Sequence, residues 1–500
     1  MEEVDLSNSY LVLGGGMSGL ITARELLKQN KQVVMLDAGK DNKDTAKKEE
    51  FKRYKKKFIS PKFSLYSNSY AFSDFEELTR VKEKNFVSIG SLAYGGFSNI
   101  WGADIRSYNQ FELSSLPFTI DEYNDSFGEI YNFITNISDD ELSYEQLLEQ
   151  SKSLKNPYID NRCRDLIDSN IFRNMNIAME HSDLAILYRD KGERKKCNFN
   201  GECLRNPAYI FNAKFEIEKL KDNKNFKYIP NTFIDSIQRH GNNYFINSSN
   251  LRDSTKTVYK TKKIYCSLGT LSTTKLVLKM CGLINKKIPL LTTPTASFIL
   301  FSLKNQRKGP TRIATCNANF NLNYNEGSEL ITGGLFPFPK DWWVNKFGSG
   351  NSSSVIYGIL DRFIFSRIII CTLNFSSNFS SNSISLNAED ELLIESKGHS
   401  EPLKKVFKTS LKVLKKAFLA EKYYLIPFTK KLSKPGEDIH LGGTLPASNL
   451  EESFSDFNGE LKAMPNFFIT DSSSLSFLAA KGQSFTAMAQ SSLITKKSLI

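Results

Sequence analysis

The fold is decided by Ser9-Tyr10-Leu11-Val12-Leu13, followed at once by Gly14-Gly15-Gly16-Met17-Ser18-Gly19. An apolar run of strand length enters a glycine-rich turn, and the turn opens directly into a helical pattern. In such a turn Gly14 permits the tight bend, Gly16 lets a phosphate group approach the backbone, and Gly19 lets helix and strand pack closely. The stretch therefore predicts the first strand, turn and helix of a nucleotide-binding βαβ unit.

A second apolar run, 32–36, completes this unit and ends in Asp37-Ala38-Gly39. It places a carboxylate about twenty residues after the turn, where the hydroxyl groups of a ribose need an acceptor. The free N–H groups at the helix start, around Met17 and Ser18, would face phosphate oxygens, and the helix dipole favours their negative charge. We therefore expect the chain to bind a dinucleotide.

The bulk composition is that of an ordinary globular protein, with 40% hydrophobic and 24% charged residues in 500 positions. This length suggests two or three folding units. The net charge of +12 bears on solubility and non-specific binding, not on fold. No nucleic-acid-binding module is recognisable, so we expect no nucleic-acid partner.

The seven cysteines, odd in number and mostly within apolar runs, suggest reduced thiols in a cytoplasmic protein. Cys197 and Cys203 do not have the CxxC spacing and no second pair follows them, so we expect no metal site. A polar, acidic leader precedes the first strand, which argues against a signal peptide. No apolar run is long enough to span a membrane.

Two further glycine-containing segments stand out. Tyr94-Gly95-Gly96-Phe97-Ser98-Asn99-Ile100-Trp101-Gly102 predicts a loop that can lie flat against a planar ligand, because glycine carries no side chain. The segment 264–278 repeats the order strand, Gly269 and helix far along the chain. This second junction indicates that the nucleotide domain is assembled from non-contiguous pieces. A short strand is also expected at 86–90.

The region 285–430 is rich in strand patterns and predicts a second, sheet-based domain. Within it, apolar residues recur on one face of a basic helix over 403–418. Packing of this helix on the sheet is favoured, and a membrane-surface helix is the alternative. The chain closes with His440-Leu441-Gly442-Gly443-Thr444, a strand over 467–473 that ends in polar residues including Asp471, and a helix beginning at Ser484.

Taken together, these pieces resemble the glucose–methanol–choline (GMC) family of FAD-dependent alcohol oxidoreductases. The GG-x-S-x-x-WG loop makes the chain more similar to divergent bacterial members than to secreted sugar oxidases. The resemblance implies FAD as cofactor, held by one set of residues near the pyrophosphate and ribose and a second set along the flavin and ribityl arm. The first set is Gly14, Gly16, Met17, Ser18, Gly19, Asp37 and Ala38; the second is Gly95, Gly96, Ser98, Asn99, Gly269, Asp471 and Ser473.

The family's catalytic histidine falls on His440. Hydride removal from an alcohol leaves a proton on oxygen that must be accepted, and histidine titrates near neutrality. The chain departs from the family where a proline and then an Asn-Pro or histidine usually follow the last strand. Ser476 stands at the proline position, and Gly482-Gln483 stands at the Asn-Pro. Lys481 or Gln483 is the candidate replacement for the second catalytic group.

The expectation is therefore an α/β protein with two domains: a Rossmann-like FAD domain from 1–110, 210–285 and 435–500, and a sheet-containing substrate domain from 111–209 and 286–434. It would oxidise a CH–OH group of a polar or sugar-like alcohol, with hydride transfer to flavin N5 and an unknown electron acceptor. Two alternatives remain open: a non-catalytic FAD-binding protein and an NAD(P)-dependent dehydrogenase. An NAD(P)-dependent dehydrogenase would leave the segment at Asp471 without a role.

Overall fold

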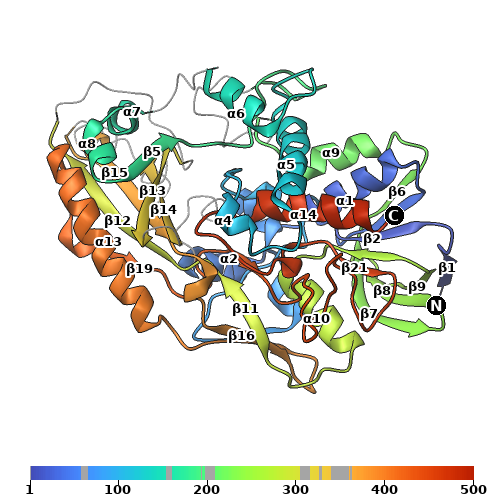
Figure 1. The fold of residues 1–500 in the computed structure, drawn as a ribbon. Coiled ribbons are helices and arrows are strands. Elements are labelled where there is room, and N and C mark those ends of the chain that lie inside the picture. The colour runs from blue at the N-terminus through green and yellow to red at the C-terminus, as the bar shows by residue number, and fades with distance from the viewer. Residues whose placement is uncertain are drawn as a thin grey trace, which may run out of the picture.

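The described residues form a mixed α/β structure with four sheets (Figure 1). The computed structural model describes residues 2–57, 66–153, 160–192, 194–196, 209–304, 316–325, 329–338, 360 and 363–500. The predicted Cys197 and Cys203 thiols lie outside these residues. Among the described residues, no group of three or more His, Cys, Asp or Glu side chains is placed to hold a metal ion. No helix in the described part of the chain is long and apolar enough to cross a bilayer.

A parallel five-stranded sheet, in the order β21-β10-β2-β3-β6, forms the centre of the half that the sequence predicts to be nucleotide-binding. Its strands are β2 (Tyr10–Leu13), β3 (Val33–Leu36), β6 (Phe226–Ile229), β10 (Ile264–Cys266) and β21 (Phe467–Ile469). The helices α1 (Met17–Lys28), α9 (Ala213–Leu220), α10 (Thr270–Met280) and α14 (Ser484–Lys497) belong to the same half. Strands from three distant parts of the chain share one sheet, as the second junction predicted.

Two further sheets adjoin this core. One has the order β1-β9-β8-β7, and the other has the order β20-β11-β16-β17-β4. Their bounds are β1 (Glu2–Asp5), β4 (Val81–Lys84), β7 (Thr232–His240), β8 (Asn243–Asn250), β9 (Lys256–Thr261), β11 (Ile288–Thr292), β16 (Asn382–Leu386), β17 (Leu392–Ser396) and β20 (Leu441–Gly442). The second of these sheets combines strands from both predicted domains, so the two predicted domains share one sheet. The exact domain boundaries stay a prediction.

The strand predicted at 86–90 is wrong, because β4 lies earlier, at Val81–Lys84. The apolar residues after it are buried without joining a sheet, and the backbone N–H of Val87 donates to the carbonyl of Pro435. The run is therefore apolar because it is a buried loop, and its apolar residues alone did not distinguish it from a buried strand. The real strand β4 alternates between half-buried and exposed residues at the end of its sheet.

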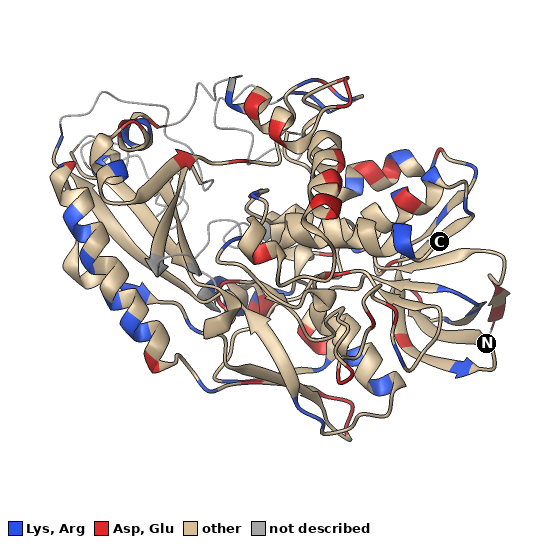
Figure 2. Cartoon of the chain, viewed as in Figure 1, with Lys and Arg blue, Asp and Glu red and all other residues tan. Residues whose placement is uncertain are grey.

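The fourth sheet has the order β18-β12-β15-β14-β13-β5, and β19 also pairs with β12. Its strands are β5 (Ile177–His181), β12 (Thr295–Ser302), β13 (Ala318–Asn325), β14 (Glu329–Pro337), β15 (Ile368–Asn374), β18 (Tyr423–Leu425) and β19 (Lys431–Leu432). Helix α13 (Glu401–Ala420) buries Leu403, Leu414 and Phe418 in the core of this sheet, while lysines follow its outer face (Figure 2). Because its apolar face is covered, the sheet-packing interpretation is confirmed over the membrane-surface one.

The remaining helices connect and flank these sheets: α2 (Lys48–Lys57), α3 (Phe75–Thr79), α4 (Gln110–Leu113), α5 (Ile120–Thr135), α6 (Tyr144–Ser153), α7 (Asn161–Ile167) and α8 (Asn170–Asn174). Helix α5 contacts α14 and shares the core of the nucleotide-binding half. Helices α7 and α8 lie instead beside β5 of the fourth sheet. The segment between the nucleotide-binding pieces is therefore divided between the two halves of the molecule.

Candidate active site

A cavity of about 900 Å³ lies between the parallel sheet and the fourth sheet. Its wall combines the turn at Gly14, Gly16 and Met17 with one end of β12, β14 and β15. Ligands of open α/β sheets bind outside the carboxyl ends of the parallel strands, which is where this cavity begins. We call the part at the glycine turn the cofactor end, and the part at His440 and the fourth sheet the reaction end.

The three glycines of the first turn differ in what surrounds them. Gly14 has a φ of +96°, and a Cβ there would lie 2.4 Å from the carbonyl oxygen of Ser267. A Cβ at Gly19 would lie 2.0 Å from the carbonyl oxygen of Gly14, so helix and strand pack at the distance that only glycine allows. A Cβ at Gly16 would meet nothing within 4 Å. The turn is therefore closed on its protein side and open on its cavity side.

Helix α1 begins at this opening. Gly16 is its N-cap and provides no side-chain hydrogen bond to the first turn, and Met17 and Ser18 line the cavity. Gly96 approaches from the opposite side, because its Cβ position lies 3.1 Å from the Cα of Gly16. Uncapped N–H groups and the positive end of the helix dipole make this a site for an anionic group such as a pyrophosphate.

Asp37 follows β3 as predicted, but its carboxylate is used inside the protein. It accepts from the backbone N–H of Gly15, and the hydroxyl of Tyr228 donates to its Oδ2 at 2.9 Å. Burial outweighs these hydrogen bonds and raises the pKa of Asp37 to about 6. Ala38 lines the cavity, whereas Asp37 lies behind that wall. The ribose contact of Asp37 stays a prediction.

The second junction is fastened to the carboxyl-terminal segment through Asp471. This carboxylate accepts from the backbone N–H of Gly269 and of Ser473, each at 2.9 Å, and from the hydroxyl of Thr273. Gly269 and Asp471 line the cavity, while the buried Ser473 does not. Burial raises the pKa of Asp471 despite these donors. The residues predicted for the ribityl arm therefore meet, with Asp471 holding the backbone in place.

In the glycine loop before Trp101, only part of the predicted set reaches the cavity. Gly96 lines it, whereas Gly95, Ser98 and Asn99 do not. The Ser98 hydroxyl donates to the Gly95 carbonyl at 2.6 Å, and the Asn99 amide donates to the Gly96 carbonyl at 2.7 Å. These side chains hold the loop in shape from behind, and contact of their own with a flavin stays a prediction.

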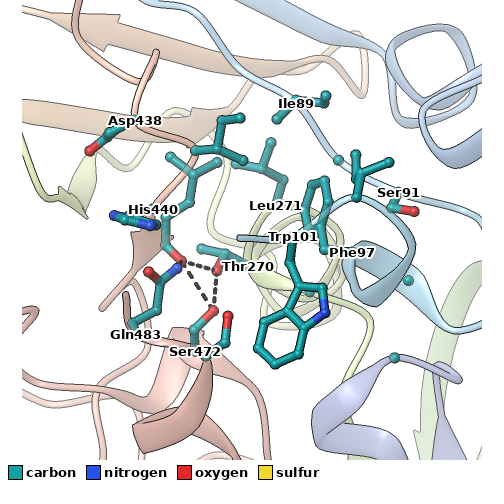
Figure 3. Close-up of a pocket in the computed structure, with 18 of the residues that line it drawn as sticks. Ile89, Ser91, Phe97, Trp101, Thr270, Leu271, Asp438, His440, Ser472 and Gln483 are labelled. Atoms are coloured by element: carbon teal, nitrogen blue, oxygen red, sulfur yellow. Dashed lines mark hydrogen bonds between the residues drawn. The ribbon is translucent and has the colours of Figure 1, made fainter. Parts of the chain in front are cut away.

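At the reaction end, His440 faces the cavity and is tied down through one ring nitrogen (Figure 3). Its Nδ1 is hydrogen-bonded to the hydroxyl of Thr293, and that hydroxyl donates to Oδ2 of Asp438 at 3.4 Å. With the Thr293 hydroxyl donating to Asp438, Thr293 accepts from Nδ1–H of His440, and Nε2 is then the unprotonated nitrogen. Burial lowers the pKa of His440 to about 4 and raises that of Asp438 to about 8.

The backbone just before His440 is strained. Ile439 has a φ of +65°, in the left-handed region, where a β-branched residue is a rare exception. Such a conformation costs about 1–3 kcal/mol and persists only where the surroundings impose it. Ala103, with a φ of +59°, stands in the same region immediately before the cavity residue Asp104. Both segments that bring charged or titratable groups to the reaction end are therefore held in unfavourable conformations.

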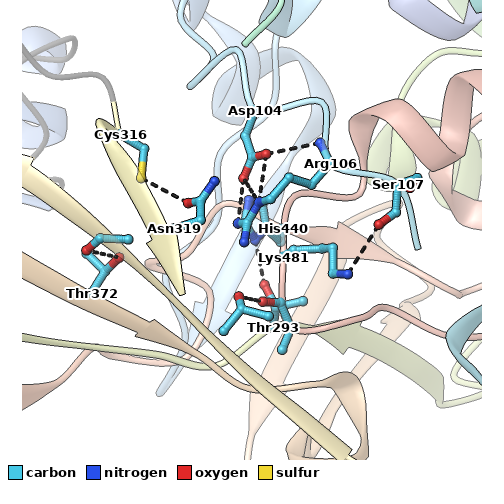
Figure 4. Close-up of polar contacts among 12 residues, drawn as sticks. Asp104, Arg106, Ser107, Thr293, Cys316, Asn319, Thr372, His440 and Lys481 are labelled. Carbon is cyan, nitrogen blue, oxygen red and sulfur yellow. Dashed lines mark hydrogen bonds and ion pairs between the residues drawn. The ribbon is translucent and has the colours of Figure 1, made fainter. Parts of the chain in front are cut away.

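Asp104 and Arg106 form an ion pair beside His440 (Figure 4). The guanidinium donates to the carboxylate from Nε at 3.0 Å and from Nη2 at 2.7 Å. Burial alone would raise the pKa of Asp104, but the Arg106 charge holds it below its usual value. Sequence reasoning did not identify either residue. The sequence does show an Asp-x-Arg spacing after the Trp-Gly loop. This spacing indicates a site only once the fold is known, because the fold places the pair beside His440.

The two candidates for the second catalytic group lie in different surroundings. Gln483 lines the cavity next to His440, and its Oε1 is buried without a hydrogen-bond partner in the described residues (Figure 3). Lys481 does not line the cavity, because its ammonium pairs with Glu112 at 2.8 Å. Of these two, Gln483 alone is placed to contact a ligand.

No family profile matches the chain, and no curated protein matches its sequence. Among solved structures, pyridoxine 4-oxidase from Mesorbium loti is similar over 98% of both chains, with a TM-score of 0.59 and 11% identity. The two chains share a fold. This likeness and the sheets described above confirm the predicted fold class, a mixed α/β structure with a Rossmann-like half and a second, sheet-containing half.

Proposed function

We propose that this protein is a GMC-like, FAD-dependent oxidoreductase that oxidises a CH–OH group of a polar or sugar-like alcohol, with His440 as the base. The observation that carries the proposal is one cavity whose cofactor end is shaped by Gly16 and whose reaction end holds a histidine fixed through Nδ1. The structural similarity to an enzyme named as an oxidase supports the same reaction class.

The residues at the cofactor end fit FAD. Gly14, Gly16 and the start of α1 would hold its pyrophosphate, and Gly96, Gly269 and Asp471 line the path toward the reaction end. When bound, FAD would supply the hydride acceptor at its N5 atom. The chain itself orients the substrate, accepts its proton and surrounds it with protein, so that little water enters.

His440 is suited to the proton-accepting role by its tautomer and its pKa. In the proposed tautomer Nδ1–H donates to Thr293 and Nε2 carries the lone pair, and Nε2 makes no hydrogen bond within the described residues. Burial lowers the pKa of the ring to about 4, so His440 is neutral at physiological pH. A neutral imidazole whose second nitrogen is held can accept the hydroxyl proton as the C–H bond is broken.

The visible absorption spectrum of the purified protein is the first test, since bound flavin gives a yellow protein. Anaerobic mixing with a panel of alcohols follows, with loss of flavin absorbance as the measurement. We expect at least one alcohol to bleach the flavin, and His440→Ala to bleach much more slowly. His240→Ala is the matched control, because His240 is exposed and does not line the cavity. Equal rates for His440→Ala and wild type would exclude the proposed base.

A non-catalytic FAD-binding protein is the second candidate. The observation that favours it is the absence of the family's Asn-Pro or histidine, replaced here by Gly482-Gln483 in the cavity wall. Under this alternative, dithionite reduces the flavin normally and no alcohol does. Bleaching by any alcohol at a rate that depends on His440 would exclude it.

A further inference from the structure

Two Asp-x-Arg pairs have the same internal geometry: Asp160–Arg162, which is buried, and Asp104–Arg106, which is partly buried. Arg162 donates to Asp160 from Nε at 2.6 Å and from Nη2, and Arg106 donates to Asp104 from the same two atoms. The pairs differ at the remaining nitrogen. Nη1 of Arg162 donates to the carbonyls of Ser366 and Ile368, at 2.6 and 2.9 Å. In the Asp160–Arg162 pair, all three guanidinium nitrogens therefore have hydrogen-bond partners within the protein.

Nη1 of Arg106 is buried and has no hydrogen-bond partner among the described residues. The side chain is 10% exposed and lines the cavity. A guanidinium that keeps an unused buried N–H carries a desolvation cost that a protein normally avoids. Because the Asp160–Arg162 pair shows how this fold completes such a pair, the missing partner at Arg106 indicates a group that arrives from the cavity.

Asn319 on β13 supplies a second unused donor in the same wall. It is 1% exposed, its Oδ1 accepts from the thiol of Cys316, and its Nδ2 is buried without a partner within the described residues (Figure 4). It lines the cavity together with Arg106 and His440. The groups near the base are acceptors instead, since Nε2 of His440 and Oε1 of Gln483 have no described donor.

We infer that the substrate is a hydroxy acid: its carboxylate binds Arg106 Nη1 and Asn319 Nδ2, and its hydroxyl faces His440. This inference rests on the proposed oxidation of a CH–OH group and names the class of alcohol. A carboxylate presents two acceptor oxygens in one plane, and hydrogen bonds from a charged guanidinium to it are shorter and stronger than neutral ones. In a reaction of this class the CH–OH carbon becomes a carbonyl and the carboxylate is unchanged.

Binding can be tested without turnover. The thermal unfolding midpoint of the purified protein is measured with propionate or benzoate, and with propionamide or benzamide at equal concentration. Ligands that bind the folded state raise the midpoint. We expect the carboxylates to stabilise the protein and to bind at least tenfold more tightly than the amides. Equal effects of acid and amide, or no effect of either, would overturn the inference.

Asn319→Leu is the decisive variant. It removes a buried donor that has no partner among the described residues, and the Cys316 thiol that donates to Asn319 Oδ1 keeps the carbonyl of Ala318 as an acceptor. The protein without ligand should therefore be about as stable as wild type. Carboxylate affinity should nevertheless fall about tenfold, a combination that a structural role would not give. Asn321→Leu is the matched control, because Asn321 lies two residues along the same strand, on the same face, and does not line the cavity. Unchanged carboxylate affinity in Asn319→Leu would contradict the assignment.

A substrate screen separates this inference from the proposed function. Hydroxy acids are compared with their amides in the anaerobic flavin assay. If neutral alcohols bleach the flavin as readily as hydroxy acids, the oxidoreductase stands and the hydroxy-acid inference fails. If carboxylates bind with the dependence on Asn319 but nothing bleaches the flavin, the carboxylate site stands and the oxidation fails.

Discussion

The two ends of the cavity are built in different ways. At the cofactor end, glycines and backbone N–H groups form the wall, and the nearby carboxylates Asp37 and Asp471 have their hydrogen bonds supplied by the protein. At the reaction end, side chains form the wall, and Arg106 and Asn319 retain buried atoms without partners in the described residues. The first end is a shape that a ligand enters, whereas the second is a set of hydrogen bonds that a ligand completes. Substitutions should therefore act through volume at one end and through charge and hydrogen bonding at the other.

Gly16→Val should produce the largest effect. Its added Cβ meets no protein atom within 4 Å, so the fold should be retained, but the side chain would occupy the opening in front of α1. We expect the purified variant to lack flavin and to show nearly the unfolding midpoint of flavin-free wild type. Gly19→Val is the contrasting variant, because its Cβ would lie 2.0 Å from the Gly14 carbonyl oxygen and should disturb folding itself. Normal flavin content in Gly16→Val would show that the cofactor end has been misassigned.

His440→Asn should slow flavin reduction by about 10²–10⁴-fold while flavin content is unchanged. The pH dependence gives a signature of the neutral base. Burial lowers the pKa of His440 to about 4, so the ring is protonated, and inactive as a base, only below that pH. In wild type, kcat/KM should therefore stay level as pH falls toward 5 and should drop near pH 4. A drop centred near pH 6.5 would mean that the ring is not desolvated as the structure indicates.

The difference between the two ends of the cavity also explains which site residues could be predicted from the sequence. The cofactor end is encoded locally: the bend at Gly14, the opening at Gly16 and the close packing at Gly19 all follow from glycine within one short turn. The reaction end takes Arg106, Asn319 and His440 from three distant segments. The catalytic role of His440 was predicted mainly from family resemblance. Its hydrogen-bond partner Thr293 lies far away in the sequence, so no local pattern shows that the ring is held. No local pattern distinguishes Arg106 from the structural Arg162.

Secondary structure shows the same limit. Apolar periodicity correctly predicted α13, because its buried face and exposed face both follow the helical repeat. Periodicity gave no indication of β5, a short strand whose residues are mainly half-buried or exposed. Its pairing with β13 is set by a partner that lies far along the chain. A strand with little burial of its own carries no periodic signal.

Asp438→Asn tests the polar network behind the base. Burial raises the pKa of Asp438 to about 8, so the folded protein holds a proton there that the unfolded chain releases near pH 4. This proton stabilises the fold at low pH, and the contribution declines as pH rises toward 8. His440 has the opposite dependence, with stability rising between about pH 4 and pH 6.5. Only Asp438 of the two therefore acts above pH 6.5.

We expect wild type to lose about 1–2 kcal/mol of unfolding free energy, relative to Asp438→Asn, between about pH 6.5 and pH 8. Urea unfolding of both proteins at several pH values measures this difference. The amide preserves the shape of the carboxyl group but does not titrate, so the comparison isolates one proton. A difference that does not vary with pH would show that Asp438 is ionised throughout this range and that the Thr293 hydroxyl bridges to a charge.

Tyr228→Phe, a substitution at the cofactor end, should have the smallest effect on flavin binding and stability. The substitution removes the hydroxyl that donates to Asp37 at 2.9 Å and keeps the ring that stacks on Tyr94. Loss of one such hydrogen bond should cost about 1 kcal/mol of stability. Because the Asp37 carboxylate lies behind the cavity wall, flavin affinity should change by less than the tenfold that an equivalent loss at a ligand contact would give. A larger loss of affinity than of stability would mean that Asp37 reaches the ribose directly, and that the cofactor end, like the reaction end, depends on a side chain completed by its ligand.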